Sequence, residues 1–216
     1  MRSKNRAGIF CIVCGIALML GALGLHLTNR QENITAEKAV AQVVPQLMHQ
    51  IQENVKAEQA DPDHPTIPKP QLQIPVELLT EEDKKMTVVE IDGYLYIGYI
   101  HFPTLNRELP VMSSWSYPQL KIAPCRYTGS VRGEDMVVMA HNYDCHFGPI
   151  SELQIGDSVL FVDMDGRTIP YQVVGKDILP PTAVDEMTSG EFDLTLFTCT
   201  YGGASRVTIY CDRADK

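Results

Sequence analysis

Three residues in the C-terminal half of the chain have side chains suited to covalent catalysis at a carbonyl group. Cys199 ends the apolar run TLFTC, and Arg206 opens the next apolar run after the short segment TYGGAS. His141 follows the apolar run DMVVMA in the same way. A thiolate can attack a carbonyl, an imidazole can transfer protons, and a guanidinium can hold an oxygen that becomes negative. These residue types predict acyl transfer through a cysteine nucleophile.

Each of these residues also has a purely structural interpretation when it is taken alone. A single cysteine in a strand is more often a buried packing residue than a nucleophile. A histidine after a strand is usually capped or on the surface, and an arginine that opens a strand is usually solvated. Arg213 is an alternative to Arg206, although it lies past the predicted strand. The arrangement of His141, Cys199 and Arg206 along the chain favours the catalytic interpretation.

The elements that must position these residues are short apolar runs separated by turn residues, from about residue 86 onward. Met164-Asp165-Gly166 predicts a hairpin, because Asp-Gly tolerates the positive φ of tight turns. The strand of Arg206 is expected to pair with that of Cys199 across TYGGAS, so both residues would lie at one end of a sheet. Many short strands without long helices between them predict an all-β barrel or sandwich. The predicted strands span residues 94–100, 135–140, 157–163, 167–178, 192–199 and 206–210, with a short helical turn over 185–190.

Several of these segments together resemble the sortases, a family of membrane-anchored cysteine transpeptidases of Gram-positive cell surfaces. TLFTC (195–199) is similar to the family's TLxTC signature, and His141 stands in an AHN context like that of the family's histidine. The segment IGYIHFPTLNRELPV resembles an early sortase pattern, and FGPISELQIGDSV resembles the family's segment before a Gly-Asp turn. The resemblance covers about residues 86–216 and keeps the order histidine, cysteine, arginine. The interval of seven residues from Cys199 to Arg206 is short for the family.

This resemblance implies an eight-stranded β-barrel with short helices and a defined reaction. Cys199 would attack the Thr–Gly carbonyl of an LPxTG-like sorting signal and form a thioacyl enzyme. An amine of a cell-wall precursor or of a pilin lysine would then release the product as an amide. His141 would act as general acid and base, and Arg206 would steady the oxyanion or orient the substrate backbone.

Two other classes of function remain open from the sequence. An exported cysteine hydrolase would use the same thiol and release its product to water. An inactive surface-binding module would keep the barrel without the chemistry. Formation of an amide product when an amine acceptor is added distinguishes a transpeptidase from a hydrolase. Alkylation of Cys199 by a thiol reagent at neutral pH tests whether the protein is an inactive binding module.

The N-terminus predicts a membrane anchor. Arg2, Lys4 and Arg6 precede an uncharged stretch over residues 7–27, and about 20 apolar residues suffice to cross a bilayer. A cleaved signal peptide is the alternative, although its apolar core usually has only about 7–15 residues. Because positive flanks stay cytoplasmic, we expect the rest of the chain outside the cytoplasm.

A stalk and a linker are expected between this anchor and the strands. Apolar residues recur at intervals of three to four between Val40 and Val55, which predicts one apolar helical face that packs on the domain or self-associates. Pro45 interrupts this face and predicts two short helices or a kink. Five prolines between Pro62 and Pro75 predict an extended spacer. The expected divisions are an anchor over residues 1–30, a stalk and linker over 31–85, and a catalytic barrel over 86–216.

The net charge and the cysteine and histidine residues bear on which ligands and cross-links the chain can have. The formal net charge of the chain is −9, from 18 basic and 27 acidic residues. When the three cations at the N-terminus are set aside, the rest of the chain has 15 basic residues against 27 acidic ones. This excess of negative charge argues against nucleic acid as a partner. His141, Cys145 and His146 lack the second ligand pair of a zinc site, so no metal or other cofactor is expected. A disulfide from Cys145 to Cys125 or Cys211 that braces the histidine loop is a further hypothesis.

Overall fold

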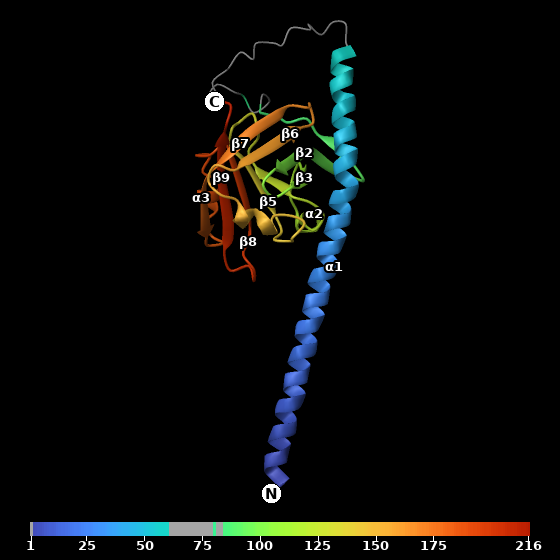
Figure 1. The fold of residues 1–216 in the computed structure, drawn as a ribbon, viewed down its shortest axis with the longest axis vertical. Helices are drawn as coiled ribbons and strands as arrows, with labels where there is room; N and C mark the ends of the chain where they lie inside the picture. Colours follow the sequence, from blue (N-terminus) through green and yellow to red (C-terminus); the bar gives the residue numbers. More distant parts are fainter. Residues whose placement is uncertain (1, 61–79, 81–83) are drawn as a thin grey trace. The chain divides into compact units, whose positions relative to one another are not determined.

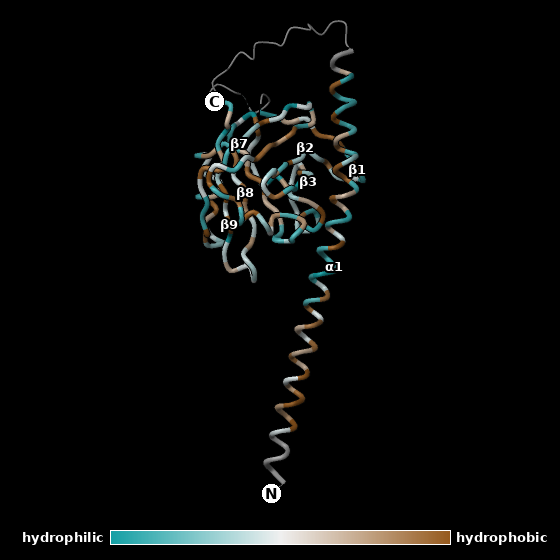
Figure 2. The backbone as a smooth tube through the Cα atoms, viewed as in Figure 1, coloured by the Kyte–Doolittle hydropathy of each residue, from teal (hydrophilic) through white to brown (hydrophobic). Residues whose placement is uncertain are grey.

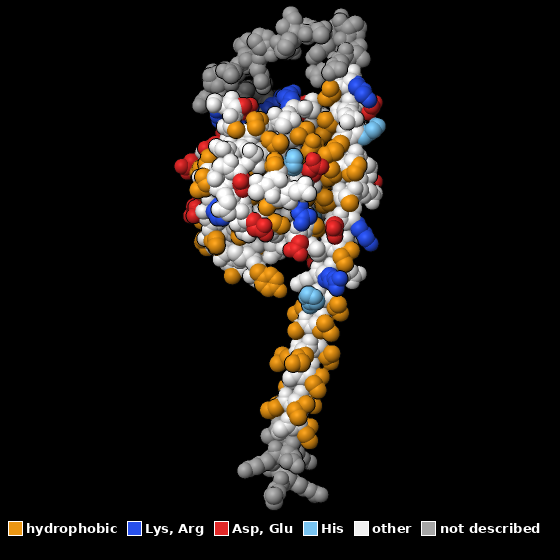
Figure 3. All heavy atoms as spheres, viewed as in Figure 1, with side chains coloured by type: hydrophobic (Ala, Val, Ile, Leu, Met, Phe, Trp, Pro, Cys, Tyr) orange, Lys and Arg blue, Asp and Glu red, His pale blue; other side chains and the backbone are white. Residues whose placement is uncertain are grey.

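The first element is one long helix, α1 (Arg2–Ala60). The computed structural model describes residues 2–60, 80 and 84–216, and it divides into the units Met1–Thr35 and Ala36–Lys216. Within the first unit the helix is apolar and exposed, as the hydropathy colouring and the space-filling view show (Figures 2 and 3). By length and composition this helix can cross a membrane, because an 18-residue window in it reaches a mean hydropathy of 2.5.

The C-terminal part of α1 belongs to the second unit and packs against the barrel. Val43, Leu47 and Ile51 are buried there with Tyr96 and Met112, which confirms the prediction that this apolar face packs on the domain. The prediction of two short helices is wrong, because the helix continues without a break through Pro45. A proline inside a helix costs about 3 kcal/mol. Burial of each large apolar side chain contributes about 1.5–3 kcal/mol, which offsets that cost.

Nine strands form one sheet within the described residues, and eight of them close into a barrel (Figure 1). The strand order is β1-β2-β3-β4-β5-β8-β9-β7-β6, and β2 also pairs with β6, which closes the barrel. The short β1 is added at the start of β2. The predicted eight-stranded barrel is therefore confirmed. The strands are β1 (Val89–Ile91), β2 (Tyr94–Phe102), β3 (Arg107–Met112), β4 (Cys125–Thr128), β5 (Met136–Ala140), β6 (Ser158–Asp163), β7 (Thr168–Leu179), β8 (Leu194–Cys199) and β9 (Arg206–Arg213).

Three short helical segments lie between strands, in line with a barrel that has only short helices. They are α2 (Tyr117–Leu120), η2 (Gly148–Glu152) and α3 (Val184–Met187). The last of these corresponds to the helical turn expected over 185–190. The 164–166 segment forms the predicted turn, since the Gly166 amide donates to the Asp163 carbonyl at 3.1 Å. The predicted spacer over 62–75 lies outside the described residues, and the divisions at residues 30 and 85 stay predictions.

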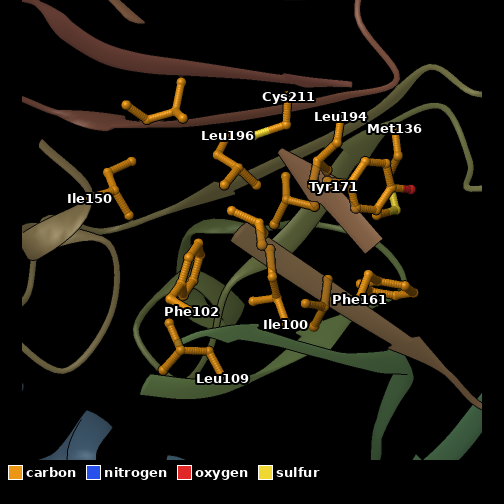
Figure 4. Close-up of a cluster of buried hydrophobic side chains, with 14 of the residues drawn as sticks. Ile100, Phe102, Leu109, Met136, Ile150, Phe161, Tyr171, Leu194, Leu196 and Cys211 are labelled. Carbon is orange, nitrogen blue, oxygen red and sulfur yellow. The ribbon is translucent and has the colours of Figure 1, made fainter. Parts of the chain in front are cut away.

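The barrel interior is filled by side chains from alternate positions of the strands, because successive strand residues point to opposite faces. Leu194 and Leu196 of β8 point inward, as do Ile100 of β2 and Phe161 of β6 (Figure 4). The remaining strand positions point outward, and on β8 these are Thr195, Phe197 and Cys199. The two faces of β8 therefore have different roles: one fills the core, and the other carries the cysteine.

Candidate active site

Cys199 and Arg206 lie directly opposite each other on neighbouring antiparallel strands. The β8–β9 ladder pairs Cys199 with Arg206 and Thr198 with Val207. Paired residues in such a ladder share a face of the sheet, with Cβ atoms about 4.5–5.5 Å apart. Val207 packs against the interior cluster, so Arg206 and Cys199 both point outward. The predicted pairing across TYGGAS is confirmed.

His141 comes to the same place through a parallel pairing. β5 runs beside β8, with Ala140 opposite Thr198, so the residue after β5 is level with Cys199. The Thr198 hydroxyl donates to the Ala140 carbonyl at 2.8 Å, and this buried bond holds the two strand ends together. The Asn142 amide nitrogen donates to the Thr200 carbonyl at 3.5 Å. The fold thus places His141, Cys199 and Arg206 at the ends of three adjacent strands.

The turn between β8 and β9 holds the Arg206 side chain. Nη1 of Arg206 donates to the carbonyls of Gly203 at 3.1 Å and Ser205 at 3.0 Å. Gly202 and Gly203 have φ of 84° and 76°, which favours glycine at both positions. The amide of Thr200 donates to the Ser205 carbonyl at 2.9 Å and closes the turn. The turn therefore holds the Arg206 side chain at the start of β9, opposite Cys199 in the strand register.

Arg213, the alternative to Arg206, lies at the opposite end of β9. Its guanidinium forms a bidentate pair with Asp215, at 2.9 and 2.8 Å. The seven residue steps from Arg206 correspond to roughly 23 Å along a strand. Arg213 is therefore a surface ion-pair residue remote from Cys199.

An apolar cluster lies on the same outer face of β8 as Cys199. Val137 of β5, Met187 of α3 and Phe197 of β8 form a separate buried cluster on this face. An aromatic series extends it, because Tyr127 packs edge-on against Phe197 at 5.7 Å and Trp115 stacks on Tyr127 at 5.7 Å. Val137, Met187 and Phe197 are covered by their neighbours, whereas Trp115 at the end of the aromatic series is exposed.

The segment after His141 is a tight loop with its own aromatic contacts. The ring of Tyr143 stacks on that of His141, with centroids 4.9 Å apart, and lies 5.4 Å from that of His146. His146 is buried, and burial lowers its pKa from 6.5 to about 4. From the sequence, His146 is a candidate only as a metal ligand. Aromatic side chains two and five residues after His141 were the available signal for the stack.

The other cysteines in the barrel are buried. None of the chain's six cysteines forms a disulfide, so the hypothesis of a bridge from Cys145 to Cys125 or Cys211 is wrong. Cys125 and Cys211 lie in two different hydrophobic clusters, which keeps their sulfurs in apolar surroundings. Burial raises the pKa of Cys125 to about 12 and that of Cys145 to about 11. Cys199 is only partly buried, which distinguishes it from these packing residues.

Within the described residues, no group of three or more His, Cys, Asp or Glu side chains is arranged to hold a metal ion. His146, one of the residues considered at the sequence level, uses its Nε2 atom 3.2 Å from the Ile122 carbonyl instead. Its imidazole therefore has a structural partner.

A comparison with protein-family models matches residues 100–214 to the sortase domain. This match spans more than half of the chain, and the chain therefore belongs to the sortase family. Among solved structures, sortase C of Streptococcus pneumoniae is 20% identical with a TM-score of 0.51, over 80% of this chain and 96% of that one.

Two structures from Clostridium perfringens give similar values. Sortase C with its C-terminal cell wall sorting motif is 20% identical with a TM-score of 0.50, over 81% of this chain and 91% of that one. A sortase D5 transpeptidase is 17% identical with a TM-score of 0.50, over 63% of this chain and 89% of that one. At these identities the structures support the fold alone. The comparison with curated proteins found no match.

Proposed function

We propose that this chain is a sortase-type cysteine transpeptidase that acts on an LPxTG-like sorting signal, with Cys199 as nucleophile. The observation that carries the proposal is the register that places Cys199 between His141 and Arg206 on one outward face. The nucleophile, a proton-transfer group and a permanent cation then lie at the ends of three hydrogen-bonded strands. Membership of the sortase family supports the same class of reaction.

In the first half of the reaction, the Cys199 thiolate attacks the carbonyl carbon of the Thr–Gly bond. A carbon–sulfur bond forms, and the carbonyl oxygen becomes negative beside the Arg206 guanidinium. The carbon–nitrogen bond then breaks, and the leaving amine takes a proton from His141. The product of this half is a thioester on Cys199.

In the second half, an amine of a cell-wall precursor or of a pilin attacks the thioester. His141 accepts a proton from the incoming amine, an amide bond forms, and the Cys199 thiolate leaves. Arg206 again faces the developing oxyanion. Its guanidinium has five N–H donors, and the two bonds to the turn carbonyls involve Nη1 alone.

We propose that the Leu-Pro part of such a signal lies along the outer face that carries Cys199, where Trp115 of the aromatic series is exposed. We further propose that α1 anchors the protein in the membrane with its N-terminus in the cytoplasm and the barrel outside. This orientation follows from the cations that precede the apolar stretch.

Intact-mass spectrometry of the full-length protein in detergent micelles tests this function. The protein is incubated with an LPxTG peptide library, with and without an amine acceptor, beside a Cys199→Ala control. A mass gain on Cys199 that converts to amide product only with the amine is expected. A gain that decays equally without the amine would instead indicate a hydrolase. Failure of every peptide, with an unreactive Cys199, would contradict the proposal.

A further inference from the structure

The loop after β5 fixes the backbone on both sides of His141. The Phe147 amide donates to the His141 carbonyl at 3.2 Å, and the amides of His146 and Gly148 both donate to the Tyr143 carbonyl at 2.9 Å. Phe147 is fully buried and packs edge-on against Phe102 of β2, 5.9 Å between centroids. The loop is thus anchored in the barrel core at its far end.

These bonds hold the backbone but leave the orientation of the His141 ring to its neighbours. The Tyr143 ring stacks on this ring, with an interplanar angle of 29° and centroids 4.9 Å apart. An imidazole that must deliver a proton needs a fixed direction, and a flat neighbour restricts rotation of the ring. Tyr143 is therefore placed to set the direction of the His141 nitrogens.

His146 is a second ring neighbour of Tyr143. The two rings are 5.4 Å apart, and His146 is only 1% exposed. Burial keeps its imidazole neutral, so Nε2–H donates to the Ile122 carbonyl 3.2 Å away. Ile122 packs against the cluster that α1 covers, so this side of the stack is tied to a second part of the core.

We propose that Tyr143 is a positioning residue that holds the His141 imidazole in its working orientation, with the buried ring of His146 as a support for Tyr143. This inference rests on the proposed function, in which His141 transfers the protons. The aromatic face is the feature that matters, because ring stacking carries the contact. The phenol hydroxyl is not required for this role.

The test uses Tyr143→Leu and Tyr143→Phe in the full-length protein in micelles. Proton transfer by a positioned residue is worth about 10²–10⁴-fold, and misplacement by about 1 Å can cost about 10²-fold. We expect Tyr143→Leu to lower kcat by roughly 10- to 100-fold with little change in KM for the peptide. Tyr143→Phe should keep most of the rate, because it keeps the ring. Tyr99→Leu is the matched control, since Tyr99 is a partly buried tyrosine of β2, which neither pairs with nor adjoins β5, β8 or β9 in the sheet.

A spectroscopic measurement tests the stack without turnover. With histidine-selective labelling, the His141 ring protons should show an upfield ring-current shift that Tyr143→Phe keeps and Tyr143→Leu removes. His141→Ala identifies the signals. If no wild-type turnover is found with any peptide, the proposed function fails while this shift still tests the stack. Equal kcat in wild type and Tyr143→Leu, or no ring-current shift in the wild type, would overturn the positioning role.

Discussion

The buried imidazole of His146 makes the stability of the barrel depend on pH in a way that can be calculated. Its pKa in the folded protein is lowered from 6.5 to about 4, mainly by burial and to a smaller extent by nearby His141, against the opposing effect of the hydrogen bond to Ile122. The unfolded chain therefore binds more protons than the folded chain between these two values. Stability rises with pH in this window, so acidification from neutral pH destabilises the fold.

The magnitude follows from the same two pKa values. From about pH 7 to about pH 5, His146 alone should lower the free energy of unfolding by about 2 kcal/mol. Below about pH 4 the full loss is about 3 kcal/mol, because one pKa unit corresponds to about 1.4 kcal/mol. His146→Gln removes the titrating group and keeps an N–H donor of similar reach for the Ile122 carbonyl. This variant should lose about 2 kcal/mol less than the wild type over the same interval.

Urea unfolding of the compact unit over residues 36–216 measures this difference. Trp115 is the one tryptophan of the chain and stacks on Tyr127, so its fluorescence reports the loss of packing. Other titrating groups, such as Asp163 with its raised pKa, contribute to both proteins and cancel in the comparison. His101→Gln, at a partly exposed site on β2, is the matched control. Wild type and His146→Gln with parallel pH dependence would refute the reasoning.

Four further outcomes are expected. Cys199→Ala should abolish thioester formation and turnover, and a wild-type rate would remove Cys199 from the mechanism. Arg206→Lys should lower kcat by about 10²-fold, as does the loss of one oxyanion donor, and unchanged kinetics would move that role elsewhere. At about pH 8, iodoacetamide should label Cys199 well before Cys125 and Cys145, because buried thiols of raised pKa stay protonated; peptide mapping measures the order. Gly98→Ala should cost at least about 3 kcal/mol in urea unfolding, since its Cβ would collide with the Val162 carbonyl at the β2–β6 closure, whereas Gly156→Ala has open space and should cost about 1 kcal/mol.

Much of the barrel could be predicted because its strands are apolar runs bounded by turn residues. The six predicted strands all form, and the turn at residues 164–166 follows from Asp-Gly. The strands β1 and β4 have only three and four residues, too few for a period-two pattern to be recognised. The unbroken helix through Pro45 was not predictable from propensity. Burial of its apolar face, a tertiary effect, outweighs the local cost of the proline.

Part of the candidate site could likewise be predicted from the sequence, and part could not. The pairing of Cys199 with Arg206 follows from a six-residue connection, since two consecutive strands joined by a short turn pair as a hairpin. The parallel pairing of β5 with β8 has no such local signal, because 53 residues separate Ala140 from Leu194. The position of His141 beside Cys199 could therefore be proposed from the sequence only through the family resemblance. The ring contacts of Tyr143 with His141 and His146 have no periodicity in the sequence and could not be predicted from it.

The two kinds of contact around His141 constrain different parts of the residue. The pairing of β5 with β8 places the backbone of His141 level with Cys199 along the strands. The Thr198 hydroxyl, which donates to the Ala140 carbonyl, holds the two strand ends together. Register cannot fix the ring, because His141 lies one residue beyond the end of β5 and its side-chain torsions are not set by the ladder. The side-chain torsions of Arg206, at the start of β9, are likewise not set by the strand pairing. The carbonyls of Gly203 and Ser205 in the preceding turn hold this side chain instead. A barrel thus brings the three residues together, while a loop stack and a turn give two of them their directions.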